Sequence, residues 1–171
     1  MLDLVLVNGL PGSGKTTLAA ELAQVLHAPL ISKDAIKEAF ADVLPAAAYR
    51  TLGIAAGEMM WTLAAAMSGE VIVESWWFKP RDQHFVEAGL RRCTPTSVVE
   101  LWCDVPAQLA KTRYAARRRH RVHNDGRQLL DAWPRWEKEA APIGICPVIP
   151  VDTSGAIDLD DLEARIKRAR T

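Results

Sequence analysis

The sequence has no excess of charge and no long apolar run, and each shortage excludes a class of protein. Its 171 residues carry 21 Lys plus Arg and 21 Asp plus Glu, so the formal net charge is zero. We therefore do not expect a protein that holds nucleic acid or a membrane surface by bulk charge, and any basic site must be local. No apolar run approaches the roughly 18 residues that a membrane span needs.

Cysteine is also scarce, because the chain has only Cys93, Cys103 and Cys146 and no C-x-x-C pair. Two of them stand among apolar residues, as buried thiols do in a reducing compartment. Residues 1–7 are apolar but include Asp3, lack a basic region and run directly into a glycine loop, unlike a signal peptide. We expect a cytoplasmic protein with no membrane partner.

The remaining composition is that of an ordinary globular protein, with 49% hydrophobic and 25% charged residues. A chain of this length buries roughly 70% of its unfolded surface. No internal repeat or Gly/Ser linker divides it, so we expect a single domain over residues 1–171.

Short runs rich in Val, Ile and Leu alternate with helical patterns along the chain. The runs predict strands at 2–7, 29–32, 71–74, 97–103 and 147–151. The stretches between and after them predict helices at 15–26, 34–44, 46–67, 81–92, 106–119, 128–141 and 159–169, with starts near Asp82, Pro106 and Asp158. This alternation predicts βαβ units and a parallel sheet covered by helices on both faces. Ligands of such folds bind beyond the carboxyl ends of the strands.

A glycine-rich loop of the form G-x-x-x-x-G-K-T joins the first predicted strand to the first predicted helix. Its glycines let backbone N–H groups turn toward an anion at a helix N-terminus, where the helix dipole already favours negative charge. Lys15 adds a positive charge for the β- and γ-phosphates, and the Thr16 hydroxyl is a ligand for Mg²⁺. ATP is the expected nucleotide, since no N-K-x-D segment is present to read guanine. The predicted nucleotide-binding residues here are Gly9, Pro11, Gly12, Ser13, Gly14, Lys15, Thr16 and Thr17.

The loop and the order of strands and helices resemble the small P-loop kinases, the superfamily of adenylate, shikimate and gluconate kinases. The resemblance spans nearly the whole chain. It implies a three-layer αβα P-loop fold with a five-stranded parallel sheet in the order 2-3-1-4-5 and a short arginine-rich lid. Residues 31–37, Ile-Ser-Lys-Asp-Ala-Ile-Lys, most resemble chloramphenicol phosphotransferase and the 5′-hydroxyl polynucleotide kinases, which place an aspartate at this point.

That aspartate, Asp34, follows the second predicted strand at the carboxyl edge of the sheet. Its carboxylate can face the γ-phosphate there and take the proton of an acceptor hydroxyl as a general base. The alternative is that Asp34 only caps the helix that follows. Lys37 lies on the same helix face, where it holds the acceptor or the transferred phosphate, or is simply solvated.

The third predicted strand ends in Glu74, and an aromatic stretch follows it. A carboxylate at a strand end can hold the water shell of Mg²⁺, although Glu stands here for the commoner Asp. The alternatives are a second base for the acceptor or a solvated strand end. Trp76 and Trp77 either line an acceptor pocket or pack against the next helix. The resemblance implies that Arg81 reaches substrate or phosphate.

Residues 111–135 concentrate basic charge, with eight Lys and Arg against two Asp. Arg113 and Arg117 share a helix face, and the R-x-x-x-R pattern is similar to that of adenylate kinases. The resemblance implies that Arg113 packs on adenine and Arg117 reaches phosphate. We assign Arg121 to phosphate as well, because guanidinium groups bind phosphate oxygens in pairs. The alternative is a solvated basic helix end.

The polar stretch at about 119–128 is expected to be an exposed lid between two helices, and we call it the lid segment. His120 and His123 lie in it among arginines that would repel a cation, so we expect no metal site there.

These residues together predict a kinase that uses Mg²⁺ and ATP to phosphorylate a hydroxyl of a small molecule. Its catalytic residues would be Lys15, Asp34, Arg117 and Arg121. The second hypothesis is a 5′-hydroxyl polynucleotide kinase. We rank it lower because a nucleic-acid strand needs a longer basic track, whereas the phosphates of ATP already account for the single basic cluster. The third hypothesis is a nucleotide-dependent ATPase or switch, which would not need Asp34 at that place. The identity of the acceptor, and whether the protein is a monomer or a homodimer, stay open.

Overall fold

The computed structural model describes residues 1–45, 49–118, 120–123 and 125–170, and its centre is one parallel sheet of five strands. The strand order is β2-β3-β1-β4-β5, which confirms the predicted order, and all neighbouring strands pair in parallel. The strands are β1 (Leu2–Gly9), β2 (Leu30–Ser32), β3 (Gly69–Glu74), β4 (Ser97–Asp104) and β5 (Val148–Asp152).

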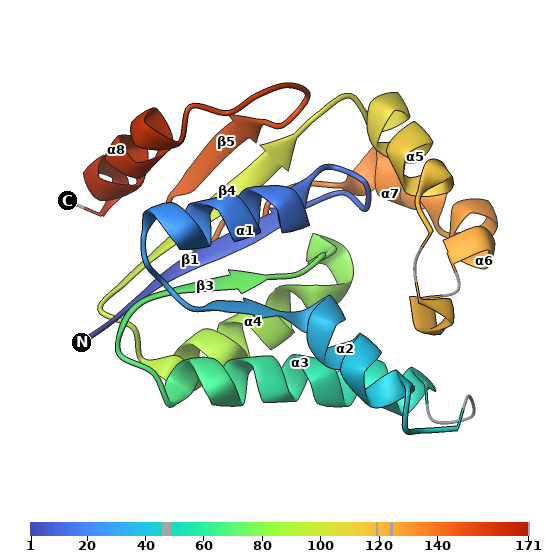
Figure 1. Cartoon of the computed structure of the whole chain (residues 1–171), viewed down its shortest axis with the longest axis horizontal. Helices are drawn as coiled ribbons and strands as arrows, with labels where there is room; N and C mark the ends of the chain where they lie inside the picture. Colours follow the sequence, from blue (N-terminus) through green and yellow to red (C-terminus); the bar gives the residue numbers. More distant parts are fainter. Residues whose placement is uncertain (46–48, 119, 124, 171) are drawn as a thin grey trace.

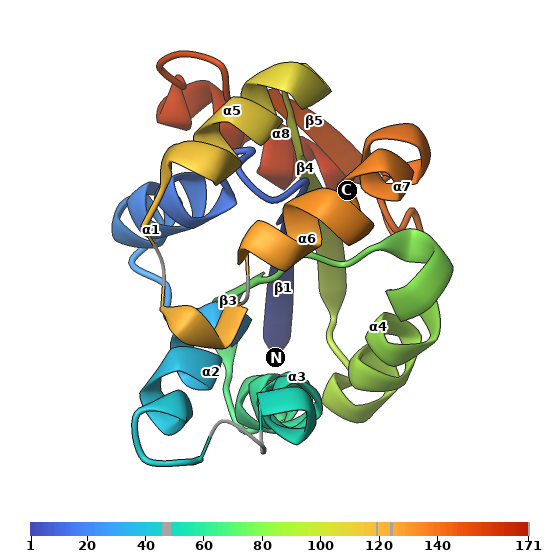
Figure 2. The same ribbon diagram turned by 90° about the vertical axis from the view of Figure 1, so that its right-hand side faces the viewer.

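Helices cover both faces of the sheet, and further helices lie beyond the ends of the strands (Figure 1). On one face lie α1 (Lys15–Val25) and α8 (Leu159–Ala169), and on the other lie α3 (Tyr49–Ala65) and α4 (Lys79–Cys93), with α2 (Lys33–Ala41) beside α3. Figure 2 looks onto the carboxyl ends of the strands, where α5 (Ala107–Ala116), α6 (Asp125–Asp131) and α7 (Trp133–Glu139) are found. A short 3₁₀ helix, η2 (Arg121–His123), joins α5 to α6.

The central strand shows why the sequence folds into three layers. Leu4 and Leu6 of β1 pack with α3 and α4, whereas Val5 and Val7 pack with α1 and α8, and all four are fully buried. Alternate side chains of a strand point to opposite faces, so a strand covered on both faces needs a continuous apolar run. None of the helices among the described residues is long and apolar enough to cross a membrane.

One predicted helix is two helices and another begins earlier than expected, and proline accounts for both differences. The helix expected over 128–141 is two helices, α6 and α7, and Pro134 lies in the first turn of α7. The helix expected to start near Asp82 begins at Lys79, with Pro80 in its first turn. Proline fits the first turn of a helix, where its missing N–H has no partner to lose, but it disrupts a helix interior.

The lid segment also differs from the expectation of an exposed loop. Val122 and His123 are buried on η2, and Val122 packs against Ala41 of α2 and Leu52 of α3.

Candidate active site

A cavity of about 500 Å³ opens at the carboxyl ends of the strands. The phosphate loop, α2, the segment after β3, α5 and η2 all contribute to its walls. The structure therefore brings together most of the residues predicted to form the site. Those that line the cavity are Pro11, Lys15, Thr16, Asp34, Lys37, Glu74, Trp76, Trp77, Arg81 and Arg117.

The phosphate loop, residues 9–16, has a backbone shape that requires glycine. Gly12 and Gly14 have φ values of 86° and 90°, in the left-handed region that favours glycine. A Cβ atom on Gly12 would lie 2.1 Å from the carbonyl oxygen of Ala110 on α5, so no other residue fits. Of the remaining predicted loop residues, Gly9 ends β1 and Ser13 is buried, whereas Thr17 is exposed on α1 outside the cavity lining.

Lys15 is held inside the loop and is only 7% exposed. Its Nζ donates a hydrogen bond to the carbonyl oxygen of Leu10 at 2.9 Å. Burial lowers the pKa of Lys15, while the nearby carboxylates of Glu74 and Asp34 act in the opposite direction. The ammonium group is thus a poorly solvated charge close to where a nucleotide phosphate would lie.

Glu74 is a buried carboxylate, 2% exposed, so the alternative of a solvated strand end is wrong. It pairs with Ser32 in the sheet register, and the Ser32 hydroxyl donates to its Oε2 at 2.6 Å. The Thr16 hydroxyl is 3.5 Å from its Oε1. A carboxylate next to a threonine hydroxyl fits Mg²⁺, which prefers oxygen ligands and takes few of them from the protein.

Asp34 is not the N-cap of α2, so the alternative that it only caps this helix is wrong. The N-cap is Ser32, whose Oγ accepts a hydrogen bond from the N–H of Ala35 at 3.5 Å. Asp34 lies in the first turn, and its side chain is 45% exposed and lines the cavity. Its carboxylate therefore faces the same space as Lys15.

The tryptophans after β3 both line the cavity and pack against neighbouring elements. Trp77 is buried and stacks on Trp61 of α3 with ring centroids 6.0 Å apart. Trp76 lies 6.5 Å from Trp102 and 6.0 Å from Trp136, again between ring centroids. The two alternatives for this stretch are thus not exclusive, because the same rings form core and cavity wall.

A buried polar network that the sequence analysis did not single out supports this wall. The side chain of Asn8 accepts from the N–H of Trp77 at 3.0 Å and donates to its carbonyl at 3.3 Å. Its Nδ2 also donates to Glu100, which accepts further hydrogen bonds from the N–H groups of Ile143 and Gly144, all three at 2.9 Å. The available signal was a carboxylate inside the apolar strand β4, since a buried carboxylate must be paired.

Three charged residues lie close together in the part of the cavity beyond Asp34. Arg81 donates from Nε and Nη2 to the two carboxylate oxygens of Asp82, both at 2.7 Å. Lys33 also lines the cavity, and burial lowers its pKa while Asp82 acts in the opposite direction. Neither Lys33 nor Asp82 was predicted as a site residue.

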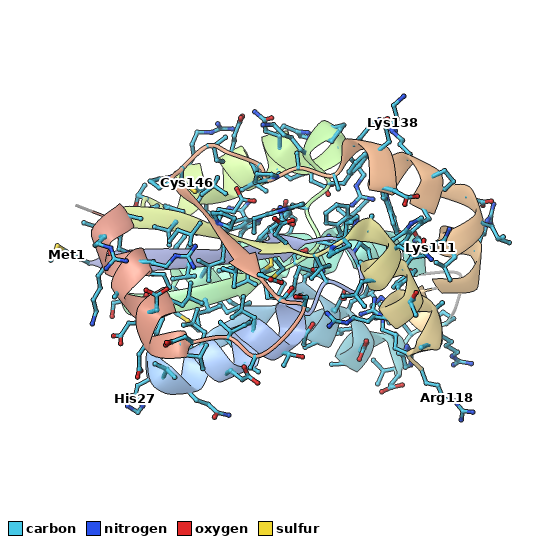
Figure 3. All side chains as sticks on the ribbon, turned by 90° about the horizontal axis from the view of Figure 1, so that it is seen from above. Met1, His27, Lys111, Arg118, Lys138 and Cys146 are labelled. Atoms are coloured by element: carbon cyan, nitrogen blue, oxygen red, sulfur yellow. The ribbon has the colours of Figure 1, made fainter. Side chains whose placement is uncertain are left out.

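Four arginines between residues 113 and 121, Arg113, Arg117, Arg118 and Arg121, have different environments. Arg113 donates to the carbonyl oxygens of Thr153 and Ser154 at 2.9 and 3.0 Å, so it holds the loop after β5. Arg117 lines the cavity, with its guanidinium 4.7 Å from the ring centroid of Tyr114. Arg121 is exposed on η2 and is not among the lining residues. Arg118 extends away from the molecule at the end of α5 (Figure 3).

Lys37 contacts the lid segment as well as the cavity. Its Nζ donates to the carbonyl oxygen of Val122 at 3.2 Å. The simple alternative of a solvated lysine is therefore wrong.

The family model described as "AAA domain" matches residues 4–133 of the chain. A cytidylate kinase from Pyrobaculum neutrophilum is 36% identical in an alignment of 88 residues that covers 45% of this chain and 48% of that protein. The chain thus spans about half the length of the curated relative that it matches.

Solved structures with the same fold include kinases. A candidate kinase from Chloroflexus aurantiacus superposes with a TM-score of 0.76 at 24% identity, over 98% of both chains. The shikimate kinase from Bacteroides thetaiotaomicron has a TM-score of 0.62 at 19% identity, over 96% of this chain and 94% of that chain. These likenesses confirm the predicted three-layer α/β P-loop fold.

Proposed function

The chain belongs to the AAA domain family, and on that premise we propose that it is a kinase that transfers the γ-phosphoryl group of Mg²⁺-ATP to a hydroxyl of a small molecule. One observation carries the proposal. The carboxylate of Asp34, which is not used as a helix cap, faces the same cavity as Lys15 of the phosphate loop. A phosphoryl donor site next to a carboxylate is the arrangement that removal of a hydroxyl proton requires.

Each of the cavity residues has a separate role in the proposed phosphoryl transfer. The phosphate loop and Lys15 bind the phosphates of ATP, and Thr16 and Glu74 would hold Mg²⁺. When bound, Mg²⁺ neutralises charge that develops on the phosphates. Arg117, on the cavity wall, binds phosphate oxygens. Asp34 accepts the proton of the acceptor hydroxyl as that oxygen bonds to the γ-phosphorus and the bond to ADP breaks.

The charges around the acceptor part of the cavity favour a neutral hydroxyl over a phosphate as the acceptor. We define the acceptor part as the region of the cavity lined by the basic residues Lys33, Lys37 and Arg81 and the acidic residues Asp34, Glu58 and Asp82, of which Glu58 also pairs with Arg92. An acceptor phosphate would need an excess of cations, and it would not need a base. The cytidylate kinase relative therefore supports nucleotide-dependent phosphoryl transfer in general, and the local charges favour a different acceptor.

The test is transfer of label from γ-labelled ATP to sugars, nucleosides, antibiotics, nucleoside monophosphates and 5′-hydroxyl oligonucleotides. Asp34→Asn is the informative variant, and Asp42→Asn is its control. Asp42 is also an exposed aspartate, at the C-terminal end of α2, but it does not line the cavity. We expect a labelled small product whose kcat falls by about 100-fold or more in Asp34→Asn, with ATP affinity nearly unchanged.

Other outcomes would overturn the proposal in distinguishable ways. Label on the oligonucleotide alone would indicate a polynucleotide kinase. Label on a nucleoside monophosphate with Asp34→Asn unaffected would indicate a phosphate acceptor. Free phosphate released at equal rates by the wild type and Asp34→Asn would indicate an ATPase or switch.

A further inference from the structure

The turn η2 docks onto α2, the helix that carries Asp34, as Figure 2 shows. Three polar contacts join them. Lys37 donates to the carbonyl oxygen of Val122, His123 Nε2 lies 2.6 Å from Glu38 Oε1, and His120 Nε2 lies 3.1 Å from Asp42 Oδ1. The buried side chain of Val122 adds an apolar contact with Ala41.

His123 occupies a special place in this contact because its ring lies between two carboxylates. It is 7% exposed, with Nε2 on Glu38 and Nδ1 3.9 Å from Oδ1 of Asp34. Asp34 and Glu38 are one helical turn apart on α2, so both side chains reach the same face. Lys37 from α2 and Arg117 from the end of α5 are among the basic residues that line the same cavity. A buried imidazole of this kind is stable only when its nitrogens have partners.

We propose that His123 is a positioning residue for Asp34, an inference that rests on the proposed function. The short contact with Glu38 fixes the ring, and the Nδ1 side of the ring then faces one carboxylate oxygen of Asp34. The proton of the acceptor hydroxyl moves to Asp34 as the phosphoryl group is transferred. Catalytic contacts are often long without substrate and shorten in the reacting complex, as the 3.9 Å separation allows.

Steady-state kinetics of His123→Asn test the proposal directly. We expect kcat to fall about 10-fold to 100-fold, as misplacement of a reacting group does, with the KM for ATP within about twofold of the wild type. Two further variants make a matched pair, because Glu38→Gln and Asp42→Asn each convert a carboxylate that contacts a histidine of the lid segment into an amide. Glu38→Gln should lower kcat more than Asp42→Asn does, because only Glu38 contacts the histidine that faces Asp34. Glu21→Gln, at an exposed position of α1 outside the cavity lining, should leave kcat unchanged. Equal effects of Glu38→Gln and Asp42→Asn would overturn the proposal.

A double-mutant comparison separates positioning from a structural role. If His123 acts through Asp34, Asp34→Asn with His123→Asn is no slower than Asp34→Asn alone, whereas independent effects would multiply. Added imidazole should restore part of the kcat of His123→Gly, and a failure of both results would remove the inference. If Asp34→Asn is inactive and His123→Asn fully active, only this inference fails. If Asp34→Asn is unaffected, the proposed function itself fails.

Discussion

At the scale of single residues, Lys15 is the clearest case of a side chain whose environment is set by function. It is buried in the phosphate loop, and burial lowers its pKa despite the nearby Glu74 and Asp34 carboxylates. An apolar side chain of similar length would avoid the desolvation of a charge at this position. A residue that is unfavourable for stability and borders a cavity is a strong candidate for a functional group.

We predict that Lys15→Met lowers kcat/KM by about 1,000-fold or more, because a charge aimed at the phosphates is lost. The same change should leave the melting temperature nearly unchanged, because the cost of desolvating Lys15 is removed while the buried Glu74 carboxylate loses a nearby positive charge. Steady-state kinetics and thermal unfolding measure the two effects. Lys138→Met, at an exposed position of α7, is the control and should change neither. A large fall in melting temperature for Lys15→Met would show that the lysine is structural.

Some site residues could be predicted from the sequence and others could not, depending on how far apart the interacting residues are along the chain. The phosphate loop is a local motif, so Gly12, Gly14 and Lys15 could be identified from their spacing. Asn8 and Glu100 are 92 residues apart, and Glu38 and His123 are 85 apart. Such pairs meet only through the tertiary fold, which no local pattern encodes.

At the scale of elements, α3 carries two glycines four residues apart, Gly53 and Gly57, on the face that lines the cavity. Glycine inside a helix costs about 1 kcal/mol relative to alanine. Packing does not demand either one, since a Cβ on Gly57 would lie 3.7 Å from Cε of Lys33 and one on Gly53 would meet nothing within 4 Å. The missing side chains leave room in the acceptor part of the cavity.

We therefore predict that Gly57→Ala raises the free energy of unfolding by about 0.5–1 kcal/mol and raises the KM for the acceptor several-fold. The KM for ATP should not change, because the phosphate loop is on the other side of the cavity. Denaturant unfolding and initial rates give both numbers. Gly126→Ala on α6 is the control, since its Cβ would meet nothing within 4 Å and it does not line the cavity. An unchanged acceptor KM in Gly57→Ala would mean that the acceptor does not contact α3.

The elements themselves were largely predictable, because apolar runs and glycine or proline signals are local properties. The five strands and their order agree with the sequence analysis. The exception is the region from η2 to α7, where Val122 is buried by contacts with α2 and α3. The sequence around Val122 is rich in charge, and this composition predicted an exposed segment. Tertiary packing against α2 and α3 instead buries the turn.

At the scale of the whole molecule, a net charge of zero is combined with one basic region. Most of that region belongs to α5 and the lid segment, beside the phosphate loop. The acceptor part of the cavity is different, because exposed apolar side chains of Ile54 and Phe85 line it together with balanced charges. A nucleic-acid strand would need a continuous basic track at this place.

This distribution predicts how acceptor binding responds to salt. A strand held through four phosphate contacts would bind about 50-fold more weakly at 200 mM than at 50 mM salt, because bound counterions are released. A neutral small acceptor releases none, so its KM should stay within about twofold over this range. The KM for ATP, measured in the same titration, should rise, because Lys15 and Arg117 face its phosphates. This rise is the control that shows that added salt weakens phosphate binding by the protein. An acceptor KM that rises as steeply as that of a 5′-hydroxyl oligonucleotide would instead place a polyanion in the cavity.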